Sequence, residues 1–130
     1  MTTVLLDSHV VHWWSAEPDR LSRTAAHALE AADELAVAGI TWFELAWLAA
    51  HERLTVTVPV RSWLEQLASE VRTIAITPAV ADAAVALPSS FPGDPADRLI
   101  YATAVEHGWR LVTKDRRLLS HRHPRPVTIW

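Results

Sequence analysis

The 130-residue chain is half apolar and has a formal net charge of −3, which fits a single domain over residues 1–130 with a buried core. It contains no cysteine, which excludes a disulfide scaffold, a thiol nucleophile and a cysteine zinc site, and suits the reducing cytoplasm, where we expect the protein. No apolar run approaches the roughly 20 residues that span a bilayer, so we expect no membrane segment.

Short apolar stretches alternate with helical patterns along the chain. In the first half we expect a strand at Val4–Leu6, a helix at His9–Trp14, a helix capped by Ser22 and running to Ala32, a strand at Leu35–Ile40, and a helix capped by Thr41 and running to about His51. In the second half we expect a helix at Val60–Val71, a strand at Thr73–Ile76, a helix from Pro78 to about Leu87, a helix from Asp94 and Pro95 to the residue before Gly108, a strand at Leu111–Thr113 and an edge strand at Val127–Trp130. This alternation predicts an α/β fold of three layers, in which helices flank a central, mostly parallel sheet of four to five short strands.

Two acids follow strands of the expected sheet. Asp7 comes directly after Val4–Leu6, and Asp115 follows Leu111–Thr113 with only Lys114 between. In an open parallel sheet the functional crevice lies beyond the carboxyl ends of the strands, so both side chains are candidates for it. A structural role is also open to each, with Asp7 as the cap of the next helix and Asp115 as a turn residue.

Glu44 is the only ionisable residue between Glu34 and His51. Its helix is apolar nearly all round, which predicts that the helix is largely buried. A buried carboxylate without a partner costs on the order of several kcal/mol, so Glu44 needs a cation or a proton. We favour a functional role over the alternative of an ion pair with Arg53.

Asp94 and Asp97 open a helix as Asp-Pro-Ala-Asp. With Asp94 at the N-cap, Pro95 at the first helical position and Asp97 at the third, the segment satisfies the capping rules and the helix dipole. This structural explanation accounts for both acids. A shared site requires in addition that Asp97 lies near Asp7.

The acids would form a metal site if they converge. Two carboxylates about 4 Å apart repel each other by roughly 4 kcal/mol at an effective dielectric near 20, so three or four of them need protons or a divalent cation. All-oxygen ligands favour Mg²⁺, with Mn²⁺ as a substitute, over zinc, and such ions promote phosphodiester cleavage. The hydroxyls of Ser8 and Thr113 could orient these ligands, although local backbone hydrogen bonding is their commoner use.

Four blocks of the sequence resemble, in order, the motifs of PIN-domain toxins of the VapC type. They are Leu5–His9 with Trp13-Trp14, Trp42–Ala46, Asp94–Ala104 and Leu111–Asp115. The third block, DPADRLIYATA, is the most specific. Together the blocks cover nearly the whole chain, and the resemblance implies a PIN-like fold.

The resemblance also implies an active site. It places the four catalytic, metal-ligating acids of the family at Asp7, Glu44, Asp97 and Asp115, with Asp94 as a cap or an outer group. It implies Mg²⁺-dependent endoribonuclease activity on RNA, homodimerisation and neutralisation by a small antitoxin protein. The alternative is a catalytically silent PIN-fold module that binds RNA or protein, against which the intact acids argue.

Basic residues next to the last acid predict contacts to RNA. Lys114, Arg116 and Arg117 are candidates for binding the RNA phosphates. Arg98 is assigned instead to an ion pair with a nearby acid. Residues 98–130 hold seven basic and two acidic residues, and residues 1–97 hold five and thirteen. A polyanion site would explain this asymmetry, but an unevenly charged, solvated surface is the simpler explanation.

The aromatic residues are assigned mainly to structure. Trp42 and Trp47 are expected in the core, and Trp13, Trp14 and Trp63 either pack there or line a groove for an antitoxin helix or a dimer contact. The histidines form no metal motif, and His121 and His123 are expected in a solvated tail.

Two other classes of Mg²⁺ protein fit poorly. A receiver-type signalling domain needs paired acids after the first strand and a phosphoacceptor Asp after the central one, but Asp7 stands alone and the third strand leads into Thr77-Pro78. A phosphatase with an Asp nucleophile needs a second acid two residues after Asp7, where His9 stands.

Overall fold

Five short strands form the centre of the structure, a computed structural model that describes residues 1–130. They are β1 (Thr3–Leu6), β2 (Glu34–Ala38), β3 (Arg72–Ile74), β4 (Arg110–Val112) and β5 (Thr128–Ile129). The strands lie in the order β3-β2-β1-β4-β5, and every neighbouring pair is parallel. In the central strand, Leu5 lies opposite Ala36 on one side and Leu111 on the other. The predicted parallel α/β sheet is confirmed, with five strands.

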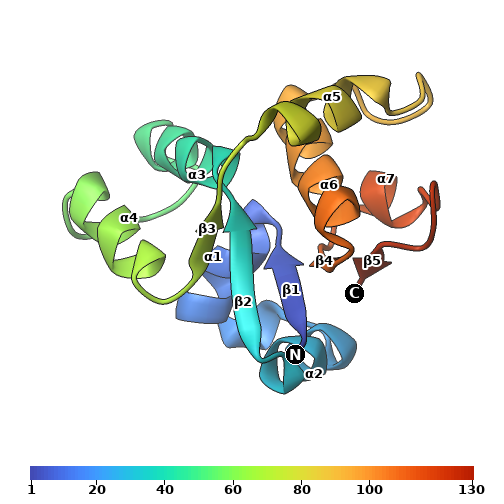
Figure 1. The fold of residues 1–130 in the computed structure, drawn as a ribbon. Helices are drawn as coiled ribbons and strands as arrows, with labels where there is room; N and C mark the ends of the chain where they lie inside the picture. Colours follow the sequence, from blue (N-terminus) through green and yellow to red (C-terminus); the bar gives the residue numbers. More distant parts are fainter.

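Helices cover both faces of this sheet (Figure 1). They are α1 (Ser8–Ala16), α2 (Arg23–Ala31), α3 (Ile40–Ala50), α4 (Val60–Ala68), α5 (Pro78–Ala86), α6 (Pro95–His107) and α7 (Arg116–Leu119), with a short 3₁₀ helix η1 at Pro18–Arg20. The predicted boundaries differ from these by at most three residues. The prediction missed η1 and α7, which are too short to show a helical period. None of the helices has the length and apolar character that crossing a bilayer requires.

Alternate residues of each strand point to opposite faces of the sheet and fill two cores. On one face Leu5 packs in a cluster with Ile100 and Tyr101 of α6. On the other face Val4 and Leu6 pack in a cluster with residues of α1, α2, α3 and α4. A parallel strand covered on both faces has no solvent-facing position, which is why β1 is apolar throughout its buried part.

Capping residues mark the ends of several helices. Ser22 Oγ accepts a hydrogen bond from the Ala25 amide at the start of α2, and Asp94 Oδ1 accepts from the Ala96 amide at the start of α6. Gly108 ends α6 with a φ of 69°, the left-handed conformation that favours glycine. These two caps and this stop were predicted from the sequence and are confirmed.

Thr41 does not cap α3, because the helix begins one residue earlier, at Ile40. Gly39 is the N-cap, and its amide donates to Ile74 O over 2.8 Å. A Cβ atom on Gly39 would approach the same oxygen to 3.3 Å, so the close contact with β3 favours glycine here. Thr41 is fully buried and lies beside Ser8, with its Oγ1 3.3 Å from Ser8 Oγ.

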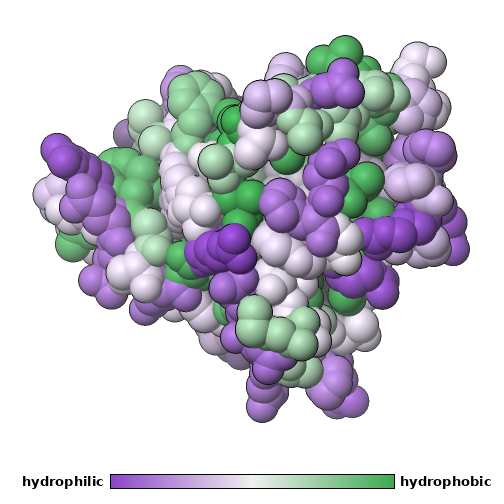
Figure 2. All heavy atoms as spheres, in the orientation of Figure 1, coloured by the Kyte–Doolittle hydropathy of each residue, from purple (hydrophilic) through white to green (hydrophobic).

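Helix α3 is more exposed than its composition predicts. Phe43 is 67% exposed, and Trp47 is 44% exposed and stacks on the His51 ring. Trp47 is therefore not in the core, and Trp42 is only half-buried, with its Nε1 donating to Thr73 Oγ1. Apolar atoms also reach the surface elsewhere, for example over α5 at the top of Figure 2. A helix at the end of a sheet is covered by other elements on one side only. When all of its residues are apolar, the sequence does not show which side is covered.

Candidate active site

The carboxyl ends of β1 and β4 lie side by side because the two strands are neighbours in the sheet. Asp7 follows β1, and Asp115 follows β4. Helices α3 and α6 approach the same end of the sheet (Figure 1) and supply Glu44 and Asp97. The structure thus brings all four acids together in one hollow of about 510 Å³, which Asp94 also lines. We call it the acidic hollow.

Asp7 uses its two oxygens in different ways. Oδ1 accepts a hydrogen bond from the Ser8 amide over 2.8 Å and caps α1, whereas Oδ2 accepts from Thr113 Oγ1 over 2.7 Å. The Thr113 hydroxyl also accepts from the Asp115 amide over 3.1 Å, so it connects the segments that carry both acids. Burial raises the pKa of Asp7, and these hydrogen bonds only partly oppose the rise.

Glu44 faces the acidic hollow without an arginine partner. Its Oε1 accepts a hydrogen bond from Ser8 Oγ over 2.6 Å. Burial raises the pKa of Glu44, and the charges of Asp7 and Asp94 raise it further. Arg53, the alternative partner considered from the sequence, lines a different hollow.

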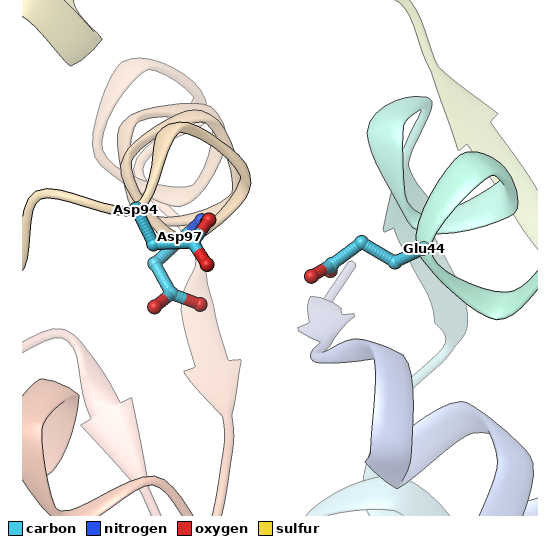
Figure 3. A group of neighbouring side chains, drawn as sticks. All are labelled: Glu44, Asp94 and Asp97. Carbon is cyan, nitrogen blue, oxygen red and sulfur yellow. The ribbon is translucent and has the colours of Figure 1, made fainter. Parts of the chain in front are cut away.

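Glu44 extends from α3 toward Asp94 and Asp97 at the start of α6 (Figure 3). One carboxylate oxygen from each of the three residues lies within 4.8 Å of the other two. Asp97 is only 8% exposed. Burial raises its pKa to about 7, with further contributions from the charges of Asp94 and Asp7. The raised pKa therefore reflects mainly the burial of Asp97 and, in addition, the negative charge of the neighbouring acids.

Arg117 is the cation in direct contact with these acids. Its Nη2 lies 3.0 Å from Asp97 Oδ2 and 2.8 Å from Asp115 Oδ2. The hydrogen bonds from Arg117 hold the pKa of Asp115 below its usual range. Two of the predicted acids are therefore matched by an arginine, and Asp7 and Glu44 are not. The side chain of Arg117, assigned to RNA from the sequence, is occupied by carboxylates although it remains 62% exposed.

The donor set of the acidic hollow fits a divalent cation. Five carboxylates line it, against Lys114 and Arg117 as its permanently charged cations. Oxygen ligands of this kind suit Mg²⁺ or Mn²⁺, and a divalent ion would relieve the repulsion among these carboxylates. The carboxylates that face the hollow, and that would hold the ion, are Asp7, Glu44, Asp97 and Asp115, with Asp94 beside them.

Sequence reasoning did not assign three residues to the acidic hollow that line it: His9, Val10 and Trp13. His9 and Trp13 lie four positions apart on α1, so they share one helix face. Lys114 Nζ lies 5.7 Å from the centre of the Trp13 ring. The (i, i+4) spacing directly after Asp7 is the signal that could have identified them.

Two assignments outside the acidic hollow are wrong. Arg98 forms no ion pair with an acid, because its guanidinium donates to backbone carbonyls of the segment that precedes α6: those of Ala84, Leu87, Pro88, Phe91 and Pro92. His121 is not solvated, since it packs edge-on against the rings of Phe91 and Tyr101 at 4.8 and 5.5 Å. His123 is exposed, as expected.

Comparison with known proteins shows similarity in both sequence and fold. The PIN domain family model matches residues 4–123. Ribonuclease VapC22 of Mycobacterium tuberculosis is 77% identical over 130 residues, which is the whole of both chains. A toxin–antitoxin complex from Klebsiella pneumoniae contains a chain that is 23% identical, with a TM-score of 0.68 over 98% of this chain and 96% of that one. The crystal structure of VapBC2 from Rickettsia felis, bound to a DNA fragment from their promoter, contains a chain that is 15% identical, with a TM-score of 0.71 over 98% of both.

Proposed function

This chain belongs to the PIN domain family, and we propose that it is an Mg²⁺-dependent endoribonuclease that acts in the cytoplasm as the toxin of a toxin–antitoxin pair. One observation carries the proposal: Asp7, Glu44, Asp97 and Asp115 come from four separate segments and line one hollow. The ribonuclease name of a relative with 77% identity over its full length supports RNA as the substrate.

Some side chains of the acidic hollow would bind the metal ion, and others orient those ligands. Bound Mg²⁺, or Mn²⁺ in its place, supplies positive charge to the phosphodiester and activates water. Asp7, Glu44, Asp97 and Asp115 would hold the ion. Thr113 and Ser8 orient these ligands, because Thr113 Oγ1 donates to Asp7 Oδ2 and Ser8 Oγ donates to Glu44 Oε1. Asp94 adds a further carboxylate at the edge.

Lys114, Arg116 and Arg117 provide the positive charge for the phosphates that flank the cut. Lys114 and Arg116 are exposed beside Asp115, and their side chains form no hydrogen bond or ion pair with the protein. Arg117 is exposed enough to reach solvent while it contacts Asp97 and Asp115. Contacts of this kind position the RNA without reading its sequence.

The apolar surface next to the acidic hollow supports protein partners. Phe43 and Trp47 of α3 line a hollow of about 420 Å³ together with Glu44 and Asp94. Exposed aromatic residues of this kind anchor protein interfaces. We assign this side of the molecule to homodimerisation or to the antitoxin, a partner that the toxin–antitoxin complexes with the same fold support.

RNA cleavage by the purified chain tests the proposed function. With Mg²⁺ and a mixed RNA pool we expect cleavage that a chelator abolishes. The variants Asp7→Asn and Asp97→Asn should cut at least about 100-fold more slowly, because losing an ion ligand removes several kcal/mol of charge stabilisation. Asp82→Asn, which removes an exposed acid on α5, is the matched control and should cut normally.

Two outcomes of this experiment would contradict the proposal. Cleavage that persists in chelator, or in both Asn variants, would point to a different mechanism. RNA that binds in Mg²⁺ but stays intact would support the alternative of a silent PIN-fold binding module.

A further inference from the structure

A second polar hollow lies next to the acidic one. It has a volume of about 580 Å³ and is lined by His9, His12, Trp13, Ala16, Glu17, Arg20, Arg53, Leu54 and Thr55. We call it the basic hollow. His9 and Trp13 line both hollows, so these two side chains of α1 form the wall between them. The two hollows are therefore neighbouring parts of one surface.

The two hollows carry opposite charge. The acidic hollow has five carboxylates and two permanent cations, whereas the basic hollow has Glu17 as its one acid and Arg20 and Arg53 as permanent cations. Glu17 is already neutralised, because its oxygens lie 3.1 Å from Arg20 Nε and 3.3 Å from His12 Nε2. The side chain of Arg53 is exposed and forms no hydrogen bond or ion pair with the protein. The surplus charge of the basic hollow is therefore positive, and Arg53 carries it.

Cationic side chains gather round the Trp13 ring. Arg20 Cζ lies 5.8 Å from the ring centre, and Lys114 Nζ lies 5.7 Å from it. The indole is only half-buried. Proteins that bind single-stranded RNA combine aromatic rings, on which bases stack, with cations that hold the phosphates. The wall between the two hollows has this composition.

We propose that the basic hollow binds the nucleotide next to the scissile bond, with its phosphate at Arg53 and its base against Trp13. The inference rests on the proposed function, because an RNA strand cut at the acidic hollow has to continue past it. Uncompensated carboxylates repel further phosphates, and the positive hollow across the Trp13 wall attracts them. A segment of the antitoxin is the competing occupant; the positive charge and the continuity with the cleavage site favour RNA.

Binding of a short fluorescein-labelled single-stranded RNA, measured by anisotropy across a salt series, tests this inference. All variants carry Asp7→Asn, so that the RNA stays intact. Arg53→Ala should weaken binding several-fold at low salt and reduce the slope of log affinity against log salt by about 0.7, the value for one phosphate contact on a single strand. Trp13→Ala should weaken binding about tenfold, and Trp13→Phe, which keeps a ring for stacking, should weaken it less.

Arg23→Ala is the matched control, because Arg23 is exposed on α2 and lines neither hollow. Equal RNA affinity and equal salt slope in Arg53→Ala and Arg23→Ala would overturn the inference. This is the result expected if the basic hollow binds only the antitoxin. If Trp13→Ala does not fold, Arg53→Ala alone tests whether the basic hollow binds RNA. If the unmodified chain cuts RNA but Arg53→Ala does not weaken RNA binding, only the role of the basic hollow is rejected. If the unmodified chain never cuts RNA, the proposed function is rejected.

Discussion

Arg117 and a divalent cation would bind the same two carboxylates. The guanidinium contacts both Asp97 and Asp115, and every carboxylate oxygen that it occupies is one fewer for an ion. The arginine therefore stabilises the metal-free acids and would compete with the proposed Mg²⁺.

Arg117→Ala should therefore raise the affinity for Mg²⁺. Each exposed ion pair is worth roughly 0.2–1 kcal/mol, so we expect an increase of about 2- to 10-fold. Isothermal titration of the chelator-treated protein with Mg²⁺ measures it without reference to activity. Arg116→Ala removes the same charge one residue away without touching the acids and is the control. An unchanged or lower affinity in Arg117→Ala would show that the arginine does not compete.

Three aspartates combine a structural role with a place in the acidic hollow. Asp7, Asp94 and Asp115 each cap a helix through Oδ1. The second oxygen of Asp7 and of Asp115 is bound by other side chains of the site, Thr113 and Arg117. A cap uses one oxygen of a carboxylate, so the structural explanation of such a residue does not exclude the functional one.

At the scale of elements, the start of α6 depends on the segment that precedes it. Arg98 donates five hydrogen bonds to carbonyls between the end of α5 and Pro92. This segment leads directly into Asp94 and Asp97. The planar guanidinium, with its five donors, is suited to holding several carbonyls at once.

Arg98→Ala should lower the free energy of unfolding by about 2–4 kcal/mol, because several carbonyls lose a charged donor together. Arg98→Lys keeps the charge, but its single ammonium cannot reach all five oxygens, so it should lose an intermediate amount. Urea unfolding measures both, and hydrogen exchange should quicken at residues 88–97. A loss below about 0.5 kcal/mol in Arg98→Ala would mean that packing alone holds the segment.

At the scale of the whole molecule, most basic side chains in the C-terminal quarter of the chain, residues 98–130, bind other groups of the protein. Of its seven basic residues, Arg98, Arg110 and Arg125 donate to backbone carbonyls and Arg117 pairs with acids. Lys114, Arg116 and Arg122 form no such bonds. Among these seven, only Arg117 has its charge matched by acids, so both explanations of the charge asymmetry remain open.

The stability of the metal-free protein should fall as the pH rises from about 4 to about 7. The pKa of Asp97 is raised to about 7 from 3.8, so the folded state holds a proton in this window that the unfolded chain has lost. Asp7 and Glu44, whose pKa values are also raised, act in the same direction. Asp115, with a lowered pKa, acts in the opposite direction, but only below this window.

Thermal unfolding in chelator at pH 5.5 and pH 8 measures this effect. We expect the free energy of unfolding to differ less between the two pH values in Asp97→Asn than in the unmodified protein, by on the order of 1 kcal/mol. Mg²⁺ should restore the stability of the unmodified protein at pH 8. The same pH dependence in both proteins would contradict the assignment to Asp97.

Much of the fold follows from local sequence patterns. The alternation of strands and helices, the caps at Ser22 and Asp94 and the stop at Gly108 depend on residues a few positions apart, and all of them are present. The four acids were found because they follow strands, interrupt an apolar helix or open one. The exposed side of α3 and the place of His121 were not predictable, because a composition does not say which elements will cover a face.

The sequence by itself determined the elements, their order and the acidic residues, because spacing and capping act within one or two turns of chain. Only the tertiary structure decided which acids meet, which of them Arg117 neutralises and where Trp13 separates two hollows of opposite charge. The hydrogen bond between Thr113 and Asp7 joins residues 106 positions apart. It exists because β4 lies beside β1, and strand order is a property of the packed sheet, which no short stretch of sequence encodes.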